Sequence, residues 1–64
     1  MTYRLDFVAL TVIRTDANGE EHDLNAGGEP CEDMADLSAL VQDLHHAGAF
    51  DAFTMGTLLA SLAV

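Results

Sequence analysis

The chain has 64 residues with 11 Asp and Glu against two Arg, a formal net charge of −9 at pH 7, while half of its residues are hydrophobic. This length predicts one domain, residues 1–64, with a small core and little room for a deep active-site cleft. The negative charge argues against direct binding to nucleic acid or to anionic membranes, so the expected partner is a basic protein surface.

The first element expected is a β-strand over residues 3–13. Tyr3, Leu5 and Phe7 alternate with polar residues, which is typical of a half-buried strand. From Val8 onward the apolar pattern changes phase. The strand therefore either becomes buried on both faces or contains a bulge near Val8.

A hairpin turn is expected at residues 16–19. The dipeptide Asn18-Gly19 favours it, because both residues tolerate positive φ angles. The returning strand, about residues 20–25, alternates only weakly. We therefore expect it to be short and to lie at an edge of the sheet.

Two helices are expected in the second half of the chain. Apolar residues recur at helical spacing over residues 31–47, with Pro30 at the first helical position and Gly48 at the C-terminal end. A second helix is expected to begin after Asp51, its N-cap, and to run through residue 62. The predicted fold is α+β, with an N-terminal β-hairpin packed against two C-terminal helices in the order ββαα.

The charge is concentrated in the middle third of the chain. Residues 16–36 have a net charge of −8, against +1 for residues 1–15 and −2 for residues 37–64. Like charges at this density destabilise a compact chain, which favours a binding role, although a solvated acidic face without a specific role is the alternative. The residues expected to contact the partner are Asp16, Glu20, Glu21, Asp23, Glu29, Glu32, Asp36 and Asp43. Glu32, Asp36 and Asp43 fall within roughly 40° of one another on the expected first helix and would form an acidic stripe there.

No arrangement of residues predicts catalysis or a cofactor. The histidines and the single cysteine, Cys31, lack the spacing of metal sites, so no metal is expected. Neither serine lies in a nucleophile-elbow motif, and there is no lysine for a phosphate-binding loop. Cys31 is expected to be a buried or half-buried small apolar residue. These observations predict a protein that is not an enzyme.

The sequence also gives expectations about the compartment. One cysteine cannot form an intrachain disulfide, so nothing indicates an oxidising environment. Asp6 interrupts the region where a signal peptide would need an apolar run. The most apolar segment, residues 53–64, is shorter than the roughly 20 residues that span a bilayer. A soluble intracellular protein is expected.

A short, lysine-free, strongly acidic chain with its own small core resembles the anti-CRISPR proteins of phages and mobile elements. In organisation it is similar to those that inhibit type I CRISPR surveillance complexes. The acidic span of residues 16–36, the helix stripe and the ββαα core carry the resemblance. It implies a DNA mimic, located in the cytoplasm of a bacterial host, that occupies the DNA-binding surface of a Cascade-like complex and blocks target binding.

Two other functions fit the same composition. The chain could be a small oligomeric adaptor that buries an apolar helix face in a dimer, because domains of this size often need such support. It could also be an antitoxin-like neutraliser of a basic toxin. Of the two oligomeric states, the sequence favours a monomer over a homodimer.

Overall fold

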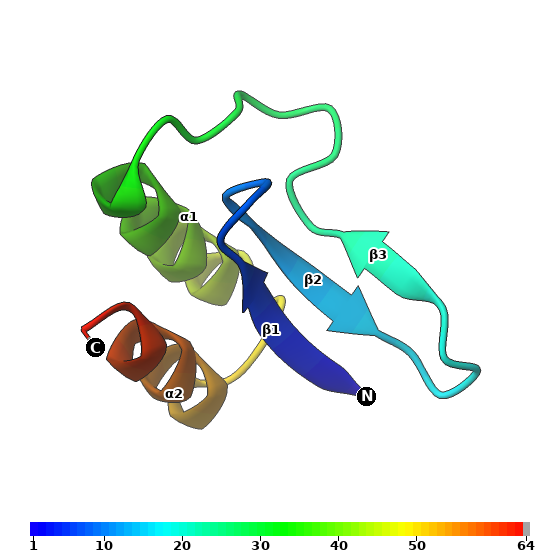
Figure 1. Ribbon diagram of the computed structural model, residues 1–64. Helices are drawn as coiled ribbons and strands as arrows, with labels where there is room; N and C mark the ends of the chain where they lie inside the picture. The colour runs from blue at the N-terminus through cyan, green and yellow to red at the C-terminus, as the bar shows by residue number, and fades with distance from the viewer. Residues whose placement is uncertain (64) are drawn as a thin grey trace.

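The computed structural model describes residues 1–63 as a three-stranded antiparallel sheet followed by two helices (Figure 1). The strand order is β1-β2-β3. The elements are β1 (Thr2–Asp6), β2 (Thr11–Thr15), β3 (Glu21–Asp23), α1 (Met34–His46) and α2 (Ala52–Leu62). The predicted α+β class, with the sheet at the N-terminus and the helices at the C-terminus, is confirmed.

The sheet has one more strand than expected, because the chain turns between β1 and β2. The carboxylate of Asp6 accepts hydrogen bonds from the backbone amides of Val8 and Ala9, at 2.9 and 3.0 Å, and so closes a tight turn. Leu10 completes the turn with φ of +54°. The expectation of a single long strand with a bulge or two buried faces is therefore wrong.

The second turn is the predicted hairpin. The Asp16 amide donates to the Glu20 carbonyl at 3.0 Å, and Gly19 adopts a φ of +83° between them. β3 contains only three residues and lies at the edge of the sheet, as predicted.

The first helix begins later than expected. Asp33, not the region of Pro30, caps its N-terminus by accepting a hydrogen bond from the Asp36 amide at 2.9 Å. The second helix begins as predicted after Asp51, which accepts from the Thr54 amide at 2.8 Å. Among residues 1–63, neither helix has the length and apolarity that crossing a bilayer requires.

The core lies between the sheet and the helices. Its buried side chains are Val12, Leu37, Val41, Phe50 and Leu58. α1 packs on β2, while α2 packs on β1 and on α1. Within the described chain β3 contacts neither helix, so this edge extends beyond the helical layer.

Candidate partner-binding surface

The eight acidic residues predicted to bind a partner lie along one continuous path. It runs from the β2–β3 turn through β3 and the loop of residues 24–33 to α1 (Figure 1). Asp16 is half-buried and the other seven residues are exposed. The structure therefore leaves most of the predicted site open to solvent.

Four of these carboxylates are engaged within the chain. Glu21 forms an ion pair with Arg4 across the sheet, at 2.8 Å. Asp23 accepts from the Thr11 hydroxyl at 2.6 Å. The other two are Asp16, in the β2–β3 turn, and Asp36, which accepts from the Glu32 amide at 3.0 Å.

The remaining four side chains, those of Glu20, Glu29, Glu32 and Asp43, make no hydrogen bond or ion pair within residues 1–63. An exposed carboxylate without an internal partner can bind an external cation without losing a contact that stabilises the fold. These four residues, called the free carboxylates below, are the ones most available to a basic partner.

The expected acidic stripe on the first helix is incomplete. Glu32 lies before the first residue of α1, so only Asp36 and Asp43 belong to the helix. The reason is that Asp33 caps the helix, which leaves Glu32 in the preceding loop. The same loop brings Glu29 close to the helix instead.

A hollow of about 340 Å³ lies between this loop and α1. We call it the α1 hollow, and its lining residues are Asn25, Glu29, Pro30, Cys31, Asp36, Ala39, Leu40 and Asp43. Three predicted site residues thus surround one concave surface that also contains apolar atoms. Sequence patterns did not reveal this hollow, because it depends on how the long loop folds back along α1.

Cys31 lies in the α1 hollow and is half-buried, as expected. Burial, followed by the negative charges of Asp36 and Asp33, raises the pKa of its thiol. A thiol with a raised pKa holds less of the reactive thiolate at neutral pH. The position of Cys31 therefore favours a packing role over a nucleophilic one.

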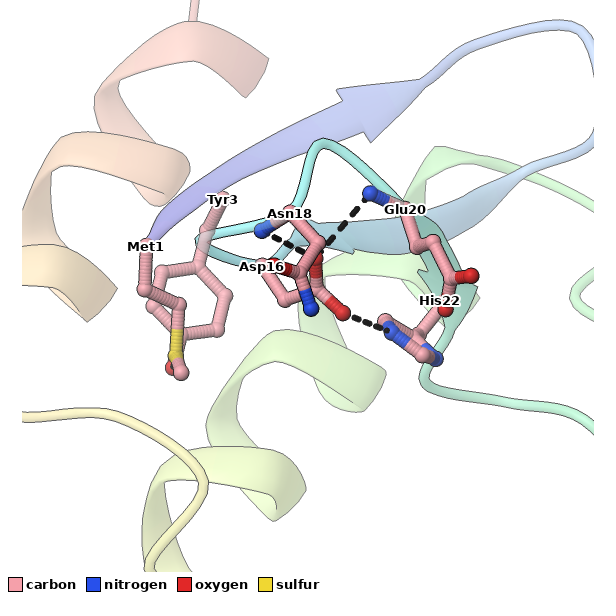
Figure 2. Close-up of polar contacts among 6 residues, drawn as sticks. All are labelled: Met1, Tyr3, Asp16, Asn18, Glu20 and His22. Atoms are coloured by element: carbon pink, nitrogen blue, oxygen red, sulfur yellow. Dashed lines mark hydrogen bonds and ion pairs between the residues drawn. The ribbon is translucent and has the colours of Figure 1, made fainter.

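The β2–β3 turn carries a second polar cluster. Figure 2 shows the Asp16 carboxylate between the backbone amides of Asn18 and Glu20, at 2.9 and 3.0 Å, and the ring of His22. His22 Nε2 lies 2.9 Å from Asp16 Oδ2. The hydrogen bond with His22, and then the backbone amides, lower the pKa of Asp16. Asp16 thus acts first as a structural residue of the turn.

Within residues 1–63, one group of side chains could hold a metal ion. It comprises Asp16, Glu20 and His22, whose potential ligand atoms lie within 4.8 Å of one another. Two of these atoms, His22 Nε2 and Asp16 Oδ2, already contact each other. A cation would have to replace that contact and complete its coordination from solvent. The absence of a metal therefore stays a prediction from the sequence.

Comparisons with protein families, with curated proteins and with solved structures find no match for this chain.

Proposed function

We propose that the chain is a non-enzymatic inhibitor that binds the basic nucleic-acid-binding surface of a partner protein and so prevents nucleic acid from binding there. The α1 hollow is the observation that carries this proposal. Glu29, Asp36 and Asp43 surround a concavity whose wall includes Ala39 and Leu40. The long side chains of Lys and Arg fit such a site, because their alkyl stems cover apolar surface while their charged ends pair with carboxylates.

The electrostatics of the chain support the same proposal. Its only cationic side chains besides the histidines are Arg4 and Arg14, and Arg4 is paired with Glu21. Few internal cations therefore compete with a partner for the free carboxylates. Opposite charges of this kind accelerate association and orient the partner, while the apolar wall of the hollow prolongs the complex.

The partner that we propose is the DNA-binding surface of a type I CRISPR surveillance complex. This choice follows the resemblance of the acidic span and the small α+β core to anti-CRISPR proteins. Inhibition would be stoichiometric. One chain would occupy the lysines and arginines that otherwise hold DNA phosphates, in place of a stretch of DNA.

An electrophoretic DNA-binding assay of a purified type I surveillance complex tests the proposal. The protein is titrated against the complex at two salt concentrations, about 50 and 250 mM, because charge-driven binding weakens with salt. The proposal expects DNA binding to be lost at a stoichiometric ratio in low salt and to recover in part in high salt. DNA binding that is undisturbed at both concentrations would contradict it.

A further inference from the structure

β1 forms an open edge of the sheet. It pairs with β2 on one side and with no other strand in the described chain. Its sequence, Thr2–Asp6, contains no proline, and its two charged residues, Arg4 and Asp6, have opposite signs and can therefore attract a second copy of the strand. An open edge of this kind can accept a further strand.

The hydrogen-bonding pattern identifies the backbone groups at that edge. The Val12 carbonyl accepts from the Leu24 amide at 3.0 Å, so the even-numbered residues of β2 direct their backbone groups toward β3. The odd-numbered residues therefore face β1, where they pair with even-numbered residues. The N–H and C=O groups of Tyr3 and Leu5 consequently point away from β2, toward the open edge.

Exposed apolar side chains gather beside the same edge. A hollow of about 260 Å³ between β1 and α2 is lined by Met1, Thr2, Tyr3, Phe53, Thr54, Thr57 and Leu58. Phe53 is 84% exposed and Met1 is 70% exposed. The Met1 side chain lies along the Tyr3 ring, and the Tyr3 hydroxyl is 3.3 Å from the Met1 sulfur (Figure 2). Phe7, which follows β1 directly, is 48% exposed.

Charge determines which partner fits this edge. α2 contains no charged residue, and residues 1–15 have a net charge of +1. The opposite edge, β3, carries Glu21 and Asp23. Two copies of a chain with a net charge of −9 repel each other through most of their surface, and β1 with α2 is the side where this repulsion is smallest.

We propose that two copies of this chain form a symmetric dimer in which β1 pairs antiparallel with β1 of the second copy, giving a continuous six-stranded sheet. With Leu5 opposite Leu5 of the partner subunit, Arg4 lies opposite Asp6 of the partner subunit, and symmetry repeats this favourable pair. The strand residues paired in this register are 4–6, because Phe7 already belongs to the following turn. A register centred on Arg4 instead places two arginines directly opposite each other.

Sedimentation analysis of matched variants tests the dimer. Phe53→Asp and Phe53→Ser change an exposed residue beside the open edge, and Met34→Asp introduces the same charge at an exposed apolar residue of α1. We expect the first two variants to weaken dimerisation by roughly tenfold or more, and Met34→Asp to leave it nearly unchanged. A monomeric wild-type protein at concentrations on the order of 100 μM would overturn the proposal, as would equal effects of all three variants.

A distance measurement tests the register. Spin labels are attached at Thr2→Cys, an exposed position in β1, in a chain that also carries Cys31→Ser. The Leu5-centred register separates the two labelled backbones by six residues of strand, or about 20 Å, whereas the Arg4-centred register gives about 13 Å. A single distance near the longer value is expected. The shorter distance, or a broad distribution, would overturn the proposed pairing.

The dimer is independent of the proposed inhibitory function, and salt separates the two. Raising the salt concentration screens the repulsion between two acidic copies, so it should strengthen the dimer, whereas it should weaken binding to a basic partner. A dimer that dissociates on addition of salt would contradict the proposed role of repulsion between the two acidic copies. Failure of the chain to inhibit DNA binding would leave the dimer unaffected.

Discussion

Four aspartates each close a turn or begin a helix with the side-chain carboxylate. Asp6 and Asp16 close the turns that precede β2 and β3, while Asp33 and Asp51 cap α1 and α2. More than a third of the 11 acidic residues therefore have a structural role. Composition alone overstates the charge that is available to a partner, and the free carboxylates are the better estimate.

Replacing Asp51 tests this structural role. Asp51→Ala removes the acceptor for the Thr54 amide and should lower the thermal unfolding midpoint at pH 7, whereas Asp51→Asn keeps an acceptor and should stay close to the wild type. Both unfolding curves can be recorded by circular dichroism. Equal losses in the two variants would show that the cap is not what stabilises the start of α2.

The difference between wild type and Asp51→Ala should also depend on pH. The Thr54 backbone amide, and then its hydroxyl, lower the pKa of Asp51 in the folded protein below the ordinary value of 3.8. The ionised carboxylate therefore stabilises the fold above pH 3.8, and this contribution is lost as the pH falls through the lower, folded-state pKa. A difference in unfolding midpoint that grows on acidification would contradict this account.

At the scale of elements, α2 divides its large apolar residues between the core and the solvent. Leu58 of α2 is 4% exposed and belongs to the core, whereas Phe53 of the same helix is 84% exposed. Leu58→Ala should lower the free energy of unfolding by about 2–5 kcal/mol, and Phe53→Ala should change it little at concentrations where the protein is monomeric. Urea unfolding measures both. A large loss from Phe53→Ala in the monomer would mean that this ring packs within the chain.

The order of the elements could be predicted from the sequence, but one turn and one helix boundary could not. The Asn18-Gly19 turn and the Asp51 cap depend on local residue preferences, which a sequence displays directly. The sequence pattern places Asp6 among the polar positions of the first strand and starts the first helix at Pro30, because the Asp6 and Asp33 carboxylates act as caps only in the backbone conformation that the chain adopts there. The division into engaged and free carboxylates depends on pairing across the sheet and was equally inaccessible.

At the scale of the whole molecule, charge divides the protein into two sides. The acidic side comprises β3, the following loop and α1. The opposite side comprises β1 and α2, and α2 contains no charged residue (Figure 1). The acidic side could serve a basic partner while the other side serves self-association. A symmetric dimer would present two acidic surfaces on one continuous sheet.

Neutralising free carboxylates should stabilise the isolated protein. Glu29→Gln with Asp43→Asn removes two negative charges from a chain of net charge −9 and breaks no hydrogen bond or ion pair within residues 1–63. The unfolding midpoint should rise slightly at low salt, and the gain should shrink as salt screens the remaining charges. A lower midpoint would show that these carboxylates support the fold.

The decisive measurement changes the position of the negative charges while their number stays the same. Glu29→Gln with Asp43→Asn, two free carboxylates of the α1 hollow, is combined with Ala52→Glu and Ala60→Glu, two exposed positions on α2, so that the net charge stays at −9 while two charges leave the hollow. Inhibition of DNA binding by a type I surveillance complex is then measured for this variant and for the wild type. The account predicts a loss of inhibition of roughly tenfold or more despite the unchanged net charge. Equal inhibition by the two proteins would contradict the claim that the carboxylates around the α1 hollow bind the partner.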